Sequence, residues 1–165
     1  MRKHLYFICP TDHLEPLINN TFKQENYYCT SLGNSVKFDN DMARQINDLI
    51  ETENIREITF VLSSDNRIVI DALGNQEFAN LHGLDNFYYE IAKQKERLKL
   101  QWKSSDLRIP ILSYYLNMKV KELQPKLSNR FAGQIKINAK IYKKPEDIFR
   151  DACLDFINRE CFSLN

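Results

Sequence analysis

The sequence predicts an α/β fold: one domain over residues 1–165, with a mainly parallel central sheet and flanking helices. Apolar runs of strand length alternate with segments of helical spacing through the first half of the chain. The run Glu57–Leu62 is β-branched and aromatic, as expected for a parallel strand covered on both faces. A length of 165 residues suits one domain with a sizeable core.

The first half of the chain predicts three strands, each followed by a helical segment or a turn. Apolar residues recur at helical spacing after the first strand, and Gly33-Asn34 marks a turn after the second. Asp39 and Asp41 offer N-caps for the helix before the third strand. The predicted elements, in order, are strand Leu5–Cys9, helix Leu14–Phe22, strand Tyr27–Ser31, helix Asp39–Glu53, strand Glu57–Leu62 and helix Ile68–Leu73.

The second half predicts a mostly helical region with one further strand. Helices are expected over Asp85–Trp102 and Ile111–Leu123. Gln134–Tyr142 alternates apolar residues with lysines, which favours a half-exposed strand at a sheet edge. A last helix is expected to open at Pro145, with five apolar residues facing inward: Ile148, Phe149, Ala152, Phe156 and Ile157.

Composition excludes several classes of protein. No apolar stretch is long enough to cross a bilayer, and the apolar run at the N-terminus is too short for a signal peptide, so we expect a cytoplasmic protein without membrane partners. The four cysteines form no CxxC pair and are expected to be reduced. The basic stretch 93–103 is interpreted as a solvated helix face, and no nucleic-acid partner is expected.

Charge is unevenly distributed along the chain. The net charge is +1, yet residues 1–80 carry 7 basic and 12 acidic side chains, whereas residues 81–165 carry 16 basic and 10 acidic ones. Such asymmetry is compatible with an electrostatic partner surface, or with attraction between two halves of the fold or two subunits.

Two strand-to-helix junctions, at residues 5–18 and 58–73, indicate where a site would lie. Ligands of open α/β sheets bind at the carboxyl ends of the strands. Polar residues stand at both junctions, with Cys9, Thr11, Asp12 and His13 in the first. The second junction carries Ser64, Asp65 and Arg67.

Together, these motifs resemble the beta-class carbonic anhydrases over nearly the whole chain. Phe7-Ile-Cys-Pro-Thr-Asp-His13 is similar to the strand end that carries the family's Cys-x-Asp-x-Arg motif. Gly33 and Asn34 match the end of its Arg-Asn-Ala-Gly-Asn segment. Further similarities lie at Phe60–Leu73, Leu84–Phe87 and Ile135–Tyr142. The resemblance implies the family's fold and its assembly into dimers or higher oligomers, and we expect a homodimer.

The resemblance also implies a zinc site of two thiolates and one imidazole, whose bound water attacks carbon dioxide. Cys9 stands at the first cysteine position, but Ser64 stands at the histidine position and Arg67 at the second cysteine position. Thr11 replaces the aspartate and His13 the arginine of the Asp–Arg pair. An arginine offers no lone pair to a metal. We therefore expect no zinc and no metal cofactor.

Several interpretations of the junction residues remain open. Cys9, Asp12, His13 and Asp65 could form a different metal site, although their spacing fits no known pattern. Alternatively, Cys9 is a packed thiol, His13 is exposed or capping, and the acidic and serine side chains cap the helices that follow.

A third interpretation makes the junctions an anion site. Arg67 near two helix N-termini, with Ser64 and Thr11 as donors, would bind a small anion. A structural salt bridge from Arg67 to Asp12 or Asp65 is the competing hypothesis.

The sequence thus favours a small-anion-binding or regulatory protein over an active lyase. The alternative is a lyase or hydratase with a rebuilt metal site, or with metal-free acid–base chemistry through Cys9, His13 and Asp65.

Overall fold

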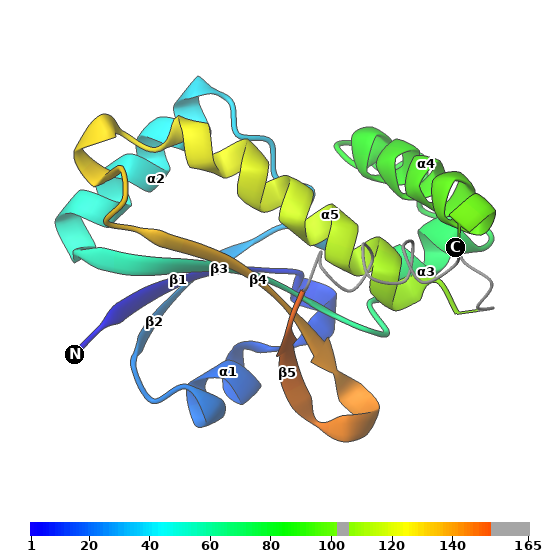
Figure 1. The fold of residues 1–165 in the computed structure, drawn as a ribbon, viewed down its shortest axis with the longest axis horizontal. Helices are drawn as coiled ribbons and strands as arrows, with labels where there is room; N and C mark the ends of the chain where they lie inside the picture. Colours follow the sequence, from blue (N-terminus) through cyan, green and yellow to red (C-terminus); the bar gives the residue numbers. More distant parts are fainter. Residues whose placement is uncertain (102–105, 153–165) are drawn as a thin grey trace.

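A five-stranded sheet forms the centre of the computed structural model, in the order β2-β1-β3-β4-β5 (Figure 1). The structure describes residues 1–101 and 106–152. The first four strands are parallel, and β5 is antiparallel to β4. The strands are β1 Lys3–Ile8, β2 Glu25–Thr30, β3 Ile55–Ser63, β4 Lys136–Lys143 and β5 Ile148–Asp151. The α/β class predicted from the sequence is confirmed.

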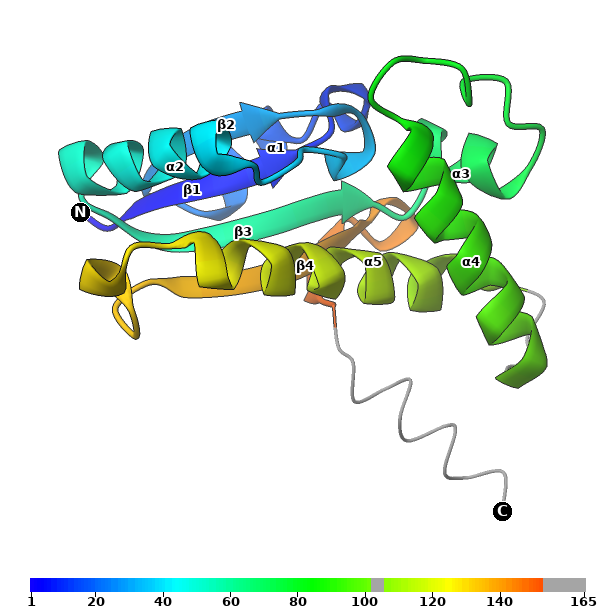
Figure 2. The same cartoon turned by 90° about the horizontal axis from the view of Figure 1, so that it is seen from above.

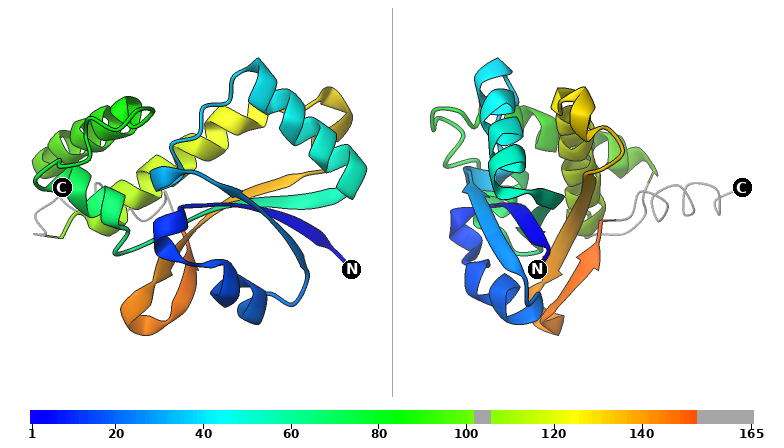
Figure 3. Two further views of the ribbon diagram at one scale, coloured as in Figure 1. Left: turned by 180° about the vertical axis from the view of Figure 1, so that it is seen from behind. Right: turned by 90° about the vertical axis from the view of Figure 1, so that its left-hand side faces the viewer.

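Helices cover both faces of this sheet (Figures 2 and 3). The helix α1 lies on one face, whereas α2 and α5 lie side by side on the other. Beyond the carboxyl ends of the strands, α3 and α4 pack next to the start of α5. The helices are α1 Glu15–Thr21, α2 Asn40–Glu53, α3 Arg67–Leu73, α4 Asp85–Gln101 and α5 Arg108–Leu123. No described helix is both long and apolar enough to span a membrane.

Alternation along the strands divides the core in two. The odd-numbered residues of β1 and the even-numbered residues of β3, such as Phe7 and Phe60, point toward α2 and α5 and belong to the main core. Their neighbours Tyr6, Ile8 and Val61 belong to a smaller core against α1. Leu14 and Ile18, from the segment that leads into α1 and from α1 itself, complete this smaller core.

The predicted start of α2 is confirmed in detail. The Asp39 carboxylate accepts a hydrogen bond from the Met42 N–H at 2.9 Å, which satisfies one of the free donors of the first turn. The helix ends where Asn54 adopts the left-handed conformation, with φ of 55°. Ile46 and Ile50, one turn apart, are buried against the sheet.

The prediction of a helix from Pro145 is wrong for the residues that the structure describes. Asp147 adopts a left-handed conformation with φ of 51°, which ends the short 3-10 turn Lys144–Glu146 and reverses the chain. Ile148–Asp151 then pairs with β4, and the rings of Phe149 and Tyr142 lie 5.0 Å apart. Phe156 and Ile157 lie outside the described residues.

The prediction of β4 as an edge strand needs a related correction. It lies between β3 and β5, and β2 and β5 form the edges. However, β5 pairs only with Lys140–Lys143, so the preceding part of β4 has no strand on that side within the described chain. The alternating lysines identified a half-exposed strand correctly, but they could not reveal a short hairpin partner.

Candidate functional site at the carboxyl ends of β1 and β3

The first junction buries the thiol of Cys9. The side chain is fully buried and lies at the end of β1. The Gly33 N–H donates a hydrogen bond to its sulfur at 3.2 Å, and the Thr11 hydroxyl lies 3.1 Å from it. These contacts bring Cys9, Thr11 and Gly33 together. Neither partner is a metal ligand of the thiolate or imidazole type.

Asp12 connects the two junctions. Its carboxylate accepts hydrogen bonds from the Ser63 N–H at 2.8 Å and from the Asn66 amide at 2.9 Å. Burial raises the pKa of this carboxyl group, and the two hydrogen bonds oppose the shift. One of the interpretations open from the sequence has Asp12 cap the helix that follows it. Its carboxylate instead joins the end of β1 to the β3–α3 turn.

The cap of α3 also differs from the sequence prediction. The side chain of Asn66, rather than Ser64 or Asp65, accepts the hydrogen bond from the Val69 N–H at 3.0 Å. Asn66 is completely buried and therefore serves both Asp12 and the helix. A polar residue directly before Arg67 was the sequence signal for this cap.

Gly33 and Asn34 form a left-handed turn beneath the junctions, with φ of 60° and 54°. The Asn34 amide donates to the carbonyl oxygens of Phe7 at 3.2 Å and Val61 at 2.9 Å, and so links β1 to β3. The buried hydroxyl of Tyr115 donates to the Asn34 carbonyl at 2.9 Å. These residues hold the site in place.

The remaining candidates lie toward the surface. The Ser63 hydroxyl donates to the Asp65 carboxylate at 3.0 Å, and Ser64 lies 3.4 Å from the same oxygen. The His13 side chain is exposed, and its backbone adopts the left-handed conformation with φ of 52°. Arg67 is exposed and pairs with neither Asp12 nor Asp65, so the salt bridge considered as an alternative does not form.

The residues at the strand ends do not fit the zinc site that the family resemblance implies. Within residues 1–101 and 106–152, no group of three or more His, Cys, Asp or Glu side chains is placed to hold a metal. The second junction contributes hydroxyl, amide, carboxylate and guanidinium groups, and its carboxylate, Asp65, lies beside Lys144 at 3.8 Å. Zinc sites of this type need thiolate and imidazole donors.

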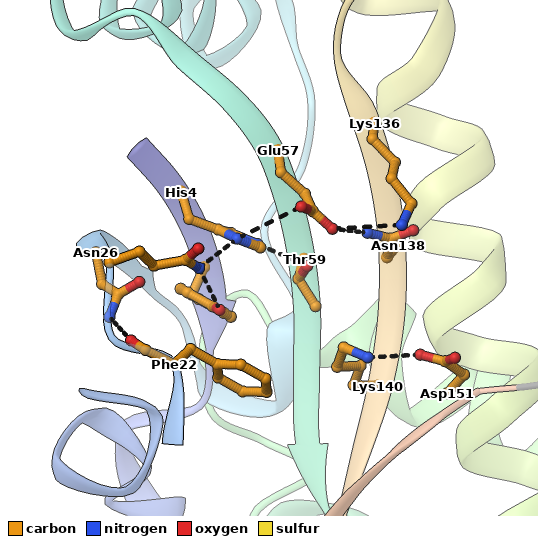
Figure 4. Close-up of polar contacts among 11 residues, drawn as sticks. His4, Phe22, Asn26, Glu57, Thr59, Lys136, Asn138, Lys140 and Asp151 are labelled. Atoms are coloured by element: carbon orange, nitrogen blue, oxygen red, sulfur yellow. Dashed lines mark hydrogen bonds and ion pairs between the residues drawn. The ribbon is translucent and has the colours of Figure 1, made fainter. Parts of the chain in front are cut away.

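A second polar cluster, which the sequence analysis missed, lies on the sheet face that carries α1 (Figure 4). His4 Nε2 lies 2.8 Å from the Thr59 hydroxyl, and the Gln24 amide donates to His4 Nδ1 at 2.8 Å. Burial lowers the pKa of His4 to about 4; Lys140 and Lys136 add to the shift, whereas Glu57 opposes it. The sequence signal for this cluster was the period-2 alternation along β1 and β3, which places His4 and Thr59 on the same face of the sheet.

Comparison with known proteins identifies the fold. No family model matches the sequence, and no curated protein matches it significantly. Solved structures do match. One of two tetrameric beta-carbonic anhydrases from the filamentous ascomycete Sordaria macrospora superposes with a TM-score of 0.70 and 14% identity, over 91% of this chain and 80% of that one.

Two further structures agree with this match. The wild-type beta-carbonic anhydrase CafD of Aspergillus fumigatus gives a TM-score of 0.68 and 16% identity over 90% of this chain and 88% of its own. The Coccomyxa beta-carbonic anhydrase in complex with acetazolamide gives 0.69 and 14% over 91% and 71%. The chain therefore has the fold of the beta-carbonic anhydrases.

Proposed function

We propose that this protein is a binding or regulatory protein with a beta-carbonic anhydrase fold, without zinc and without hydratase activity. The observation that carries the proposal is the position of Asp12. Its carboxylate takes the Ser63 N–H and the Asn66 amide, so protein groups join the two strand ends where a metal site would have to form.

The chemistry of Cys9 supports the same conclusion. A cysteine binds zinc as a thiolate, together with other thiolates or imidazoles. The Cys9 sulfur contacts a hydroxyl and a backbone N–H, and Arg67 on the second junction would repel a cation. One thiol with these neighbours lacks the further thiolate or imidazole donors that a zinc site needs.

The ligand that we propose for the strand ends is a small anion at Arg67. The guanidinium is exposed and forms no ion pair with any described residue, so its charge is available to an external carboxylate or oxyanion. The Ser64 and Thr11 hydroxyls are the donors that would accompany it. Asp12 and Asp65 oppose this binding by their charge, which predicts weak rather than tight affinity.

Metal analysis is the first test. Protein purified without chelator should contain much less than one zinc per chain, and stopped-flow measurements should show no carbon dioxide hydration above the buffer rate. Neither Cys9→Ser nor the control Cys29→Ser should change either result. Stoichiometric zinc that Cys9→Ser removes but Cys29→Ser leaves would refute the proposal.

Anion binding is tested separately by thermal unfolding with added bicarbonate, acetate or phosphate at constant ionic strength. Stabilisation that Arg67→Gln abolishes, and that Arg56→Gln at an exposed position near the start of β3 leaves intact, would support the strand-end site. Equal stabilisation of the wild type and Arg67→Gln would exclude it.

We also propose a homodimer. The Sordaria macrospora enzymes are tetrameric. Within the described part of this chain β2 has β1 as its only strand neighbour, which leaves an open edge, and the two halves of the sequence carry opposite charge. Light scattering coupled to size exclusion should give about twice the chain mass, and a monomer at micromolar concentration would contradict this part of the proposal.

A further inference from the structure

A pocket of about 320 Å³ lies between α4 and α5, away from the residues discussed so far. Gln94 and Arg97 line it from α4, and Tyr114 and Lys121 line it from α5. The strand-end residues Cys9, Asp12 and Arg67 are not among its walls. Any ligand of this pocket is therefore independent of the function proposed above.

Gln94 gives the first indication of a ligand. Its side chain is 4% exposed, yet its amide oxygen is buried without a hydrogen-bond partner, and no described residue bonds its amide nitrogen. A buried polar group without a hydrogen-bond partner destabilises the folded state. A residue that lines a pocket and carries an unpaired amide is suited to contact a polar ligand there.

The charges around the pocket give the second indication. Lys93, Arg97 and Lys121 line it together with one acidic residue, Glu90, and none of the three cations forms an ion pair with a described residue. Another lysine of α4 behaves differently, because Lys99 pairs with Glu96 at 3.1 Å. Lys95 of α4, which does not line this pocket, donates to the Leu73 carbonyl at 2.9 Å. The positive charge at the pocket is therefore left uncompensated except by Glu90.

Arg97 is already oriented for a ligand. Its guanidinium lies 5.0 Å from the centre of the Tyr114 ring and donates a hydrogen bond to the Tyr114 hydroxyl at 2.6 Å. This contact fixes one edge of the planar group and reduces the entropy that would be lost on binding.

We propose that this pocket binds a phosphate group, either inorganic phosphate or a small phosphate monoester. A phosphate offers several acceptor oxygens to two lysines and an arginine, and to the side-chain N–H groups of Gln94. The Tyr114 ring and Met118 beside the cations leave room for a small organic group.

Titration calorimetry of the full chain with inorganic phosphate tests the proposal, with chloride replacing phosphate at the same ionic strength. We expect binding that Arg97→Gln and Lys121→Gln each weaken about tenfold. Lys99→Gln makes the same charge change on the same helix outside this pocket and should bind as the wild type does. A titration with glycerol phosphate distinguishes a monoester from the free ion by which of the two binds more tightly.

Gln94→Leu removes the side-chain amide and should weaken phosphate binding. The thermal midpoint of the variant shows whether it still folds. Phosphate should shift the side-chain amide signal of Gln94 in nitrogen-15 spectra of the wild type, a readout that does not depend on any variant. No binding by the wild type, or equal weakening by Lys99→Gln, would overturn the proposal. Loss of binding in Arg67→Gln alone would place the anion at the strand ends instead and would also overturn it.

Discussion

The ring of Phe87 occupies the space that a side chain on Gly33 would need. A Cβ atom on Gly33 would lie 2.9 Å from the nearest ring carbon of Phe87, and Gly33 has φ of 60°. The ring cannot easily give way, because Phe87 is 2% exposed and packs edge-on against Tyr115 at 5.1 Å. Gly33 also donates its N–H to Cys9, so this contact positions the first junction.

We predict that Gly33→Ala lowers the free energy of unfolding by about 2–4 kcal/mol, because left-handed strain adds to overpacking. Urea unfolding measures the loss. Gly133→Ala is the control, since Gly133 also has positive φ, of 74°, but nothing lies within 4 Å of the position that a Cβ atom would take there. A loss no larger than that of Gly133→Ala would show that Phe87 adapts.

The bridge from Asn34 to two strands gives a second prediction. Asn34→Asp removes the donor that serves the Phe7 and Val61 carbonyls and places a carboxylate against them. The free energy of unfolding should therefore fall by about 2–4 kcal/mol. Asn54→Asp is a matched control, because Asn54 has nearly the same φ of 55° but is exposed. Chemical denaturation at pH 7 compares the two variants, and similar costs would argue against the bridge.

Removal of the Asp12 carboxylate should cost about 1–3 kcal/mol, because it leaves the Ser63 N–H and the Asn66 amide unpaired. The cost should depend on pH. Burial raises the pKa of Asp12 above its ordinary 3.8, so the native state holds this proton more tightly than the unfolded chain does. The contribution of Asp12 to the free energy of unfolding is thus fully present below about pH 3.8. It falls as the pH rises through the native pKa.

The measurement is the difference in unfolding free energy between the wild type and Asp12→Ala at pH 4 and at pH 7. We expect the larger difference at pH 4. A difference that grows toward pH 7 would mean that the hydrogen bonds outweigh burial in setting the pKa.

His4 should produce the opposite dependence in the same pH range. Its pKa falls from 6.5 to about 4 on folding, so below pH 6.5 the unfolded chain takes up a proton that the native state refuses. The stability that His4 provides is present above about pH 6.5 and is lost toward pH 4, to the extent of about 2–3 kcal/mol.

Unfolding free energies from pH 7 to pH 4 check this prediction in the wild type and in His4→Gln. The variant should lose less stability on acidification. His82→Gln, which removes an exposed histidine, should follow the wild type. If His4→Gln follows the wild-type curve, protonation of His4 does not drive the acid sensitivity.

The strands and helices that were predictable are those with strong local signals. The apolar run of β3 and the Asp39 cap of α2 depend on neighbouring residues alone, and both appear as expected. The last strand was missed because Ile148, Phe149 and Ala152 suit an amphipathic helix as well as a hairpin. Pairing with β4, which the spacing of apolar residues does not encode, selects the strand.

The candidate site shows the same division. Sequence placed Cys9 and Thr11 after the first strand, Gly33 after the second and the Ser64–Arg67 turn after the third. Because parallel strands present their carboxyl ends at the same edge of a sheet, these segments were expected near one another. It could not assign the partner of Asp12. A carboxylate at that position can cap its own helix or reach another strand, and the choice depends on distances between segments more than 50 residues apart.

The class of fold, the order of most elements and the residue types at the strand ends follow from local periodicity and from the residues present, so they could be predicted. The contacts between distant residues became visible only in the folded chain: Asp12 with Ser63 and Asn66, Phe87 with Gly33, and Gln94 beside three cations that form no ion pair. Such contacts depend on the packing of the whole sheet and its helices, and no local stretch of sequence contains them.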